Sequence, residues 1–301
     1  MRVSSILSTA PGTRRTAFAV TDWGLLTGIA LIWGSSFLLI AIGLEAFPPT
    51  VVTTLRLAVG AATLALFPAS RRPVDRADFP RIVLLGVIWM GFPMLLFPIA
   101  QQWISSSLAG MLNGSMPIFS ALIAALLLRK TPGRYQIVGV LLGLIGIVAI
   151  GLPGMEGGPS VLRGTLLVLA ATISYGVSVN LAVPLQQRYG AIPVIMRAQL
   201  VAVALVAPFG LVHARQVQFA WGPLAAVAAL GVFGTGLALV AMTVLAGRVG
   251  ATRASIAIYF LPVVAILLGV FFHGEHVAPL SIVGTAVVLI GAFLASRAEA
   301  P

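Results

Sequence analysis

The sequence predicts an all-α integral membrane protein of ten transmembrane helices, built as two inverted five-helix repeats. Three observations lead there: an apolar composition, long apolar runs, and residues that recur at a fixed offset. Of the 301 residues, 59% are hydrophobic and 8% are charged, and the mean hydropathy is +1.09. A soluble domain carries about 25% charged residues, because its exterior must face water. Lipid is therefore the predicted solvent.

The apolar runs indicate helices instead of a barrel. Strands of a membrane barrel alternate apolar and polar residues over about 10 positions. Ile137–Ile150 and Val263–Phe272 are long runs without such alternation. A helix that crosses the hydrocarbon core needs about 20 mostly apolar residues. Ten segments meet this expectation, in order: Trp23–Leu44, Pro49–Ala69, Arg81–Ala100, Ser105–Leu128, Gln136–Leu152, Leu162–Leu185, Ala191–Val212, Trp221–Leu245, Thr252–Phe272 and Ala278–Ser296.

Basic residues predict the orientation of these helices. Fourteen of the 18 Arg and Lys residues fall in the N-terminal segment, the even-numbered links and the C-terminus. The odd-numbered links hold only Arg163 and Arg215. Because cytoplasmic loops are rich in Arg and Lys, both ends are expected in the cytoplasm, and the net charge of +11 reflects topology, not nucleic-acid binding. We therefore expect a multi-pass protein of a bacterial-type inner membrane.

The chain also repeats itself weakly. Four residues recur at an offset of 145, and two more at offsets of 142 and 141: Pro117 with Pro262, Val138 with Val283, Gly139 with Gly284, Gly146 with Gly291, Gly34 with Gly176 and Arg56 with Arg197. With five helices per half, the second half must enter the membrane upside down. Inverted repeats are typical of secondary transporters, which hold substrate near the midplane between the halves.

These features resemble the EamA-like branch of the drug/metabolite transporter superfamily. The resemblance rests on the five-plus-five helices, on Trp33-Gly34-Ser35-Ser36-Phe37, on Arg56, and on a mid-span proline before a Gly-rich helix in each half. It predicts a cytoplasmic N-terminal segment over residues 1–22, a first EamA-like repeat over 23–153 and a second over 162–296. It implies export of small metabolites or drugs.

One departure from that branch concerns acidic residues. Its members commonly have a Glu at the end of the fourth and ninth helices. Glu275 stands at the ninth, but Arg129-Lys130 stands at the fourth. No symmetric role for the Glu is therefore expected.

Two arginines inside spans are the sharpest functional signal. A charge in the bilayer core is costly and is expected to face a cavity or a partner. Arg56 lies about seven residues into its span, roughly 10 Å along the helix axis, and Arg197 lies at a similar depth from the other side. They could clamp an anionic substrate or act as a gate. Alternatively, they could snorkel to headgroups or cap helix-end carbonyls.

Five further residues are candidates for substrate binding or gating. Asn113 and Asn180 are mid-span amides that should point inward, either to a polar substrate or to a neighbouring helix. Trp33 and Tyr175 occupy matched positions too deep for interface anchors, and Tyr259 also lies within a span. Aromatic side chains of this kind suit a pocket wall or ordinary helix packing.

The glycines of the fifth helix leave two readings open. Gly139, Gly143 and Gly146 have the spacing that lets helices approach closely, either within the chain or at the face of a homodimer. The sequence holds no cysteine, no HExxH metal motif and no GxxxxGK[ST] loop, so we expect no metal, no cofactor and no ATP-driven step.

We therefore expect a secondary carrier, not an enzyme, because no His or Asp lies inside a span. Its partners would be a small-molecule substrate and the lipid bilayer. The absence of a mid-span carboxylate favours a zwitterionic or anionic metabolite, such as an amino acid, over a lipophilic cation. The alternatives are a multidrug or cation efflux carrier, and a scaffold or lipid scramblase that transports no small solute.

Overall fold

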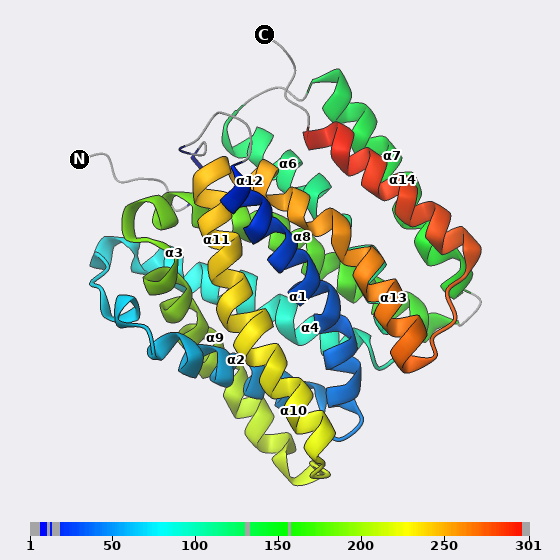
Figure 1. The fold of residues 1–301 in the computed structure, drawn as a ribbon, viewed down its shortest axis with the longest axis horizontal. Coiled ribbons are helices and arrows are strands. Elements are labelled where there is room, and N and C mark those ends of the chain that lie inside the picture. Colours follow the sequence, from blue (N-terminus) through cyan, green and yellow to red (C-terminus); the bar gives the residue numbers. More distant parts are fainter. Residues whose placement is uncertain (1–6, 11–12, 14–18, 130–132, 156–157, 297–301) are drawn as a thin grey trace.

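The computed structural model describes residues 7–10, 13, 19–129, 133–155 and 158–296, and these residues form helices and links without a strand (Figure 1). In the first half, defined here as residues 23–153, the third predicted span contains a π-helix and the fourth is broken in two. The elements of this part are α1 (Val20–Leu44), α2 (Pro49–Ala65), η1 (Pro68–Arg71), η2 (Arg76–Asp78), α3 (Phe79–Leu85), the π-helix η3 (Gly86–Gly91), α4 (Phe92–Ala100), α5 (Ser106–Asn113), α6 (Met116–Leu127) and α7 (Arg134–Met155).

The second half, residues 162–296, has elements in a similar order. Its third helical rod again contains a π-helix, and its fourth is again interrupted before a proline. The elements are α8 (Pro159–Tyr189), α9 (Ala191–His213), η4 (Ala214–Gln216), α10 (Trp221–Ala229), the π-helix η5 (Leu230–Leu237), α11 (Ala238–Val249), α12 (Ala251–Ala254), the 3-10 helix η6 (Ser255–Phe260), α13 (Leu261–His273) and α14 (Pro279–Ser296).

The helices have the length and composition of membrane spans. In the described residues, seven continuous helical stretches are long and apolar enough to cross a bilayer. Three shorter apolar helices, Pro49–Ala65, Ala257–His273 and Pro279–Ala295, fall within the second, ninth and tenth predicted segments. A helix of 17 residues is about 25 Å long, slightly less than the hydrocarbon core. The structure is thus that of an all-helical membrane protein, and the count of ten spans stays a prediction.

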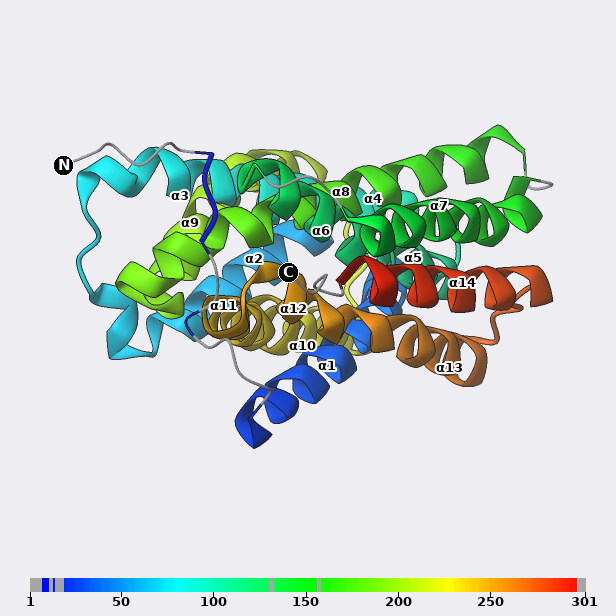
Figure 2. The ribbon, with the colours of Figure 1, turned by 90° about the horizontal axis from the view of Figure 1, so that it is seen from above.

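The two halves interleave. Pairs of neighbouring helices repeatedly combine one member from each half: α7 with α14, α2 with α9, α1 with α13, and α6 with α8. Figures 1 and 2 show α7 and α14 running side by side at one edge of the molecule. The site enclosed by these helices therefore belongs to both halves.

Glycines explain the closeness of α7 and α14. A Cβ on Gly139 would lie 2.4 Å from the Gly291 carbonyl oxygen, and a Cβ on Gly146 would lie 2.7 Å from that of Gly284. Only glycine permits this backbone approach. The small-residue positions of α7 thus pack between the halves of one chain, and Gly143 faces Ile118 of α6.

The two π-helices sit in matching surroundings. η3 packs against α9, where a Cβ on Gly86 would lie 2.8 Å from the Ala198 carbonyl. η5 packs against α2, where a Cβ on Gly231 would lie 3.0 Å from the Arg56 carbonyl. π-Turns widen a helix locally and are frequent at functional sites. The second of these contacts places Arg56 beside η5.

Candidate functional site

A cavity lies in the middle of the helices, with a volume of about 50 Å³ for the centres of water molecules, enough for a few waters. Its wall combines residues from both halves. The lining residues are Trp33, Ser36, Phe37 and Ile40 of α1, Arg56 of α2, Trp89 of η3, Met94 and Phe97 of α4, Asn113 of α5, Met116 of α6, Tyr175 and Val179 of α8, Leu239 and Met242 of α11, and Ile258 of η6.

Arg56 brings the cavity its charge. The side chain is 4% exposed, and its Nε donates a hydrogen bond of 3.1 Å to Thr235 Oγ1 on η5. The Thr235 hydroxyl donates in turn to the Leu230 carbonyl, at 3.2 Å. Among the described residues, Nη1 and Nη2 of Arg56 have no hydrogen-bond partner, and no carboxylate forms an ion pair with this side chain. The guanidinium is therefore held at one nitrogen and keeps its terminal fork available.

Aromatic rings form one wall of the cavity. Phe37 and Phe97 meet edge to face with their centroids 5.5 Å apart, and Phe97 stacks on Tyr175 at 5.8 Å. The Trp33 indole N–H donates to the Gly234 carbonyl of η5 at 2.8 Å, which fixes this ring between α1 and the π-helix. Such a wall presents flat apolar faces to anything that enters.

The remaining lining consists of flexible apolar side chains with few polar groups. Met94, Met116 and Met242 contribute flexible, polarisable side chains that adapt to different shapes. Asn113 is 5% exposed, and its Oδ1 accepts a hydrogen bond of 3.4 Å from Thr172. The Ser36 hydroxyl donates to the Ile32 carbonyl at 2.8 Å. Together with Arg56, these groups could orient a ligand that is otherwise held by apolar contacts.

Four predicted site residues meet at this cavity, namely Trp33, Arg56, Asn113 and Tyr175. Asn180 lies elsewhere: its Nδ2 donates to the carbonyls of Ser120 and Gly176, both at 2.9 Å, and so ties α8 to α6. Tyr259 is 9% exposed and neighbours the lining residue Ile258, but it is not part of the lining.

Arg197 is also placed away from the cavity. Its Nη1 donates to the carbonyls of Ser70 and Pro193, at 3.2 and 3.0 Å, and its Nη2 donates to that of Arg72 at 2.8 Å. These carbonyls belong to the η1 link and to the preceding turn of α9. The geometry is that of a helix-end cap, one of the two alternatives to a substrate contact.

Most of the apolar lining residues and Thr235 were not predicted as site residues from the sequence. One signal was available for α1, because Trp33, Ser36, Phe37 and Ile40 have the spacing of one helical face. Nothing in the sequence distinguished that face from one that packs on a neighbour. Thr235 lies in a π-turn, where the ordinary helical period does not apply.

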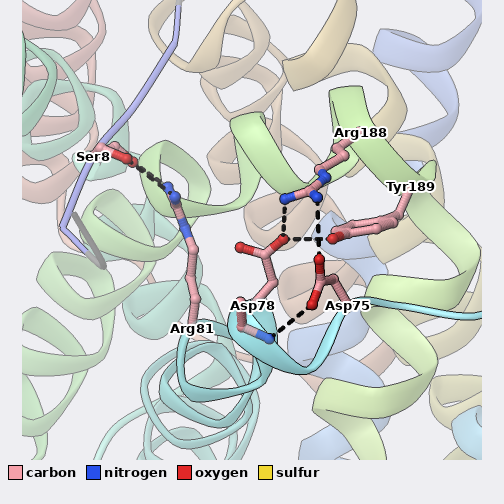
Figure 3. Close-up of polar contacts among 7 residues, drawn as sticks. Ser8, Asp75, Asp78, Arg81, Arg188 and Tyr189 are labelled. Carbon is pink, nitrogen blue, oxygen red and sulfur yellow. Dashed lines mark hydrogen bonds and ion pairs between the residues drawn. The ribbon is translucent and has the colours of Figure 1, made fainter. Parts of the chain in front are cut away.

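Charged groups outside the cavity gather at helix ends. Figure 3 shows Arg188 pointing toward Asp78 and Asp75, with nitrogen–oxygen distances of 2.8 and 3.4 Å, while Arg81 points toward Ser8. Arg248 and Asp22 form a third ion pair at 3.0 Å. Each of these ion pairs joins an Arg of the second half to an Asp from the front part of the chain.

A different contact occurs beyond α13. The Glu275 carboxylate accepts hydrogen bonds from the backbone N–H groups of Ser106 and Ser107, at 2.7 and 2.8 Å. It thereby caps the first turn of α5, where helix N–H groups lack partners of their own. A segment of the second half is thus tied to the broken fourth rod of the first.

Apolar helices that enclose a cavity with a few buried polar groups are typical of membrane transporters. Comparison with models of known protein families identifies the family. The EamA-like transporter family model matches residues 23–152 and again residues 162–297, and the chain belongs to this family. The resemblance to the EamA-like branch is thereby confirmed.

Two relatives have names that describe the export or efflux of amino acids or their metabolites. A probable terminal-alkyne amino-acid exporter of Streptantibioticus cattleyicolor is 28% identical over 283 residues, which cover 91% of this chain and 93% of that protein. A probable amino-acid metabolite efflux pump of Salmonella typhimurium is 26% identical over 150 residues, 49% of this chain and 48% of the pump.

A solved crystal structure supports the fold. One of its chains superposes with a TM-score of 0.63 at 21% identity, covering 91% of this chain and 96% of that one. The identity is low, so this likeness concerns the helical architecture alone.

Proposed function

We propose that this transporter exports a small carboxylate-bearing metabolite, an amino acid or a related zwitterion or anion, across the inner membrane. One observation carries the proposal: Arg56 is buried in the cavity with its Nε bound to Thr235, and its terminal nitrogens have no hydrogen-bond partner among the described residues. A guanidinium fork matches the two oxygens of a carboxylate. The names of the two amino-acid exporting relatives agree with this chemistry.

The proposed mechanism is alternating access between two inverted halves of five spans each. Support comes from the matched helix pairs, from the two π-helices and from the family model, which matches each half separately. Both broken rods resume at positions 145 residues apart, Met116 and Leu261, each followed by a proline. Interruptions of this kind are where carrier helices bend around a substrate site.

A change of conformation is part of this proposal. The cavity holds only a few water molecules, so a metabolite needs the surrounding helices to separate. The proposed orientation places both termini in the cytoplasm, following the distribution of Arg and Lys. The ion pairs of Arg188 and Arg248 would then lie at the cytoplasmic ends and the Glu275 cap at the outer end.

Reconstituted protein provides the test. Liposomes loaded with a mixture of amino acids should take up labelled amino acid by counterflow, and Arg56→Ala should abolish this uptake. Uptake of a quaternary ammonium dye is the competing measurement. Dye transport that persists in Arg56→Ala, with no amino-acid counterflow in the parent protein, would refute the proposal.

The cavity wall also gives a reason to test the second candidate, efflux of lipophilic cations. Aromatic faces attract cations, and methionine side chains adapt to varied shapes. The Arg56 charge opposes this function, so the dye measurement separates the two. Homodimer formation stays a prediction, and the α7 glycines do not support it, because they pack on α14 and α6.

A further inference from the structure

We infer that the cavity takes its substrate as a monoanion, in which a carboxylate is attached to an apolar, preferably aromatic body and no ammonium group is present. The inference rests on the proposed function and narrows its substrate class. It would make deaminated, hydroxylated or N-acylated relatives of amino acids better ligands than the free amino acids. The charges, the hydrogen-bonding groups and the shape of the cavity each support it.

The balance of charge is the first argument. Among the described residues that line the cavity, Arg56 alone has a formal charge. Of the seven carboxylates in the sequence, the five in the described residues lie at helix ends or in links: Asp22, Glu45, Asp75, Asp78 and Glu275. Four of them have partners there, since Asp22 pairs with Arg248, Asp75 and Asp78 with Arg188, and Glu275 caps α5. Among the described residues, no carboxylate lines the cavity to accompany a bound ammonium.

The hydrogen-bonding groups point the same way. Nη1 and Nη2 of Arg56 are donors. Asn113 uses its oxygen for Thr172 and retains its amide N–H groups as donors. The hydroxyls of Ser36 and Thr235 donate to backbone carbonyls, and Thr235 Oγ1 also accepts from Arg56. The two hydroxyl protons are therefore already used, and the donors that remain, those of Arg56 and Asn113, suit the lone pairs of a carboxylate.

Burial in the cavity makes the difference in affinity between a carboxylate and an ammonium large. An ion moved out of water loses its hydration, and only a well-placed partner offsets that loss. Arg56 provides such a partner for a carboxylate. The aromatic wall could attract an ammonium, but the positive charge of Arg56 in the same small cavity repels it. A zwitterion must bring its ammonium into the cavity together with its carboxylate. The cost of moving the ammonium out of water therefore offsets part of the affinity that the carboxylate gains.

The apolar wall defines the rest of the ligand. The rings of Phe37, Phe97 and Tyr175 form a continuous series of edge-to-face and stacked contacts. Met94, Met116 and Met242 complete the lining with side chains that can fit around a ring or a branched chain. A phenyl or long aliphatic group would replace apolar contacts without leaving a polar atom unsatisfied.

Three probes with one phenyl body separate these charges. L-3-Phenyllactate is an anion, L-phenylalanine is a zwitterion of the same size, and 2-phenylethylamine is a cation. Binding to the purified full chain in lipid nanodiscs is measured by calorimetry at neutral pH, which avoids passive leakage of the probes through liposomes. We expect phenyllactate to bind at least about tenfold more tightly than phenylalanine, and phenylethylamine to bind most weakly.

Matched variants test the origin of the preference. Arg56→Gln should remove the advantage of phenyllactate, whereas Arg197→Gln, the equivalent arginine outside the cavity, should retain it. Equal or tighter binding of phenylalanine would overturn the inference, and so would an unchanged preference in Arg56→Gln or no binding of phenyllactate. Amino-acid counterflow in liposomes decides separately on the proposed function, which survives if phenylalanine is both bound and transported.

Discussion

Arg56 and Arg197 are equivalent in sequence but differ in their surroundings. Both lie about seven residues into the second helix of their half, α2 and α9, and these two helices pack against each other. Arg56 reaches into the central cavity and is held by Thr235. Arg197 instead caps carbonyls of the η1 link and of its own helix. Positions matched in the predicted repeat therefore do not provide equivalent chemistry.

The packing contacts between the two halves and the polar contact at the cavity differ in their symmetry. Contacts between the halves keep their symmetry where glycine faces glycine, as between α7 and α14, because close packing depends on shape alone. The polar contact is one-sided. η5 provides Thr235 beside Arg56, whereas η3 has the sequence Gly86–Gly91 without a hydroxyl or amide side chain. One half thus carries the charge of the site and the other carries the residue that positions it.

Removing the Arg56 charge should have the largest effect. Arg56→Gln is expected to weaken carboxylate binding by about 30-fold to 4,000-fold, since a buried charge pair lost on one side costs about 2–5 kcal/mol. Arg56→Lys should recover only part of the affinity, because an ammonium lacks the planar fork. Calorimetric titration of both variants measures this. A difference of less than about threefold from the parent would contradict the assignment of Arg56.

The glycine contact between α7 and α14 can be disrupted separately by substitution. Gly139→Ala places a Cβ 2.4 Å from backbone atoms of Ala295 and Gly291, so α7 and α14 must separate. We expect a loss of about 1–3 kcal/mol in the free energy of unfolding. Gly24→Ala in α1 is the matched control, because nothing lies within 4 Å of its Cβ. Thermal unfolding in nanodiscs compares them, and equal stability would show that the close approach is not needed.

Thr235→Val tests whether the Thr235 hydroxyl is needed to position the Arg56 guanidinium for carboxylate binding. Valine has the same shape as threonine but cannot accept the hydrogen bond from Arg56 Nε. A hydrogen bond to a charged group is worth about 1.5–3 kcal/mol, so carboxylate affinity should fall about tenfold or more. Thr235→Ser should restore it. If both variants behave alike, the hydroxyl does not position the arginine.

Arg197→Gln should have a smaller and different effect. It removes hydrogen bonds to three carbonyls near the protein surface, with an expected cost of about 1 kcal/mol in the free energy of unfolding. Substrate affinity and counterflow should remain those of the parent protein. A rise in the apparent KM comparable to that of Arg56→Gln would show that the two arginines share one role in another conformation.

The smallest expected effect concerns pH and the one-sided Glu275 cap. Burial by itself raises the pKa of Glu275, but hydrogen bonds from Ser107 and Ser106 outweigh it and hold the pKa below its usual value. Its folded pKa lies below its unfolded one, so the ionised carboxylate stabilises the fold near neutral pH. This contribution is lost as the pH falls through the folded pKa.

Glu275→Gln should therefore melt at a lower temperature than the parent at neutral pH, and this difference should shrink toward about pH 4. The neighbouring His273 and His276 are unchanged in both proteins, so they do not contribute to the difference. A gap in melting temperature that stays constant over this range would mean that the charge does not act through the cap.

Much of the fold followed from local sequence. Apolar runs placed the helices, and the recurring Pro117 and Pro262 marked rods that the structure shows broken one or two residues earlier. The π-turns η3 and η5 were not predicted, because they arise where α9 and α2 press on glycine-rich turns. The assignment of the α7 glycines to a contact between the halves also depended on a helix 145 residues away.

The sequence by itself determined the solvent and the helices, because hydropathy and helical period are properties of short segments, and it predicted the repeated plan. It also identified Arg56 and Arg197 as the charged residues well inside the predicted spans. Only the tertiary structure decided which of the two meets the cavity. A helical period tells which face of α2 or α9 a residue occupies, but the neighbour on that face is set by packing between distant segments. Here that neighbour is a π-turn with Thr235 for one arginine and a loop with bare carbonyls for the other.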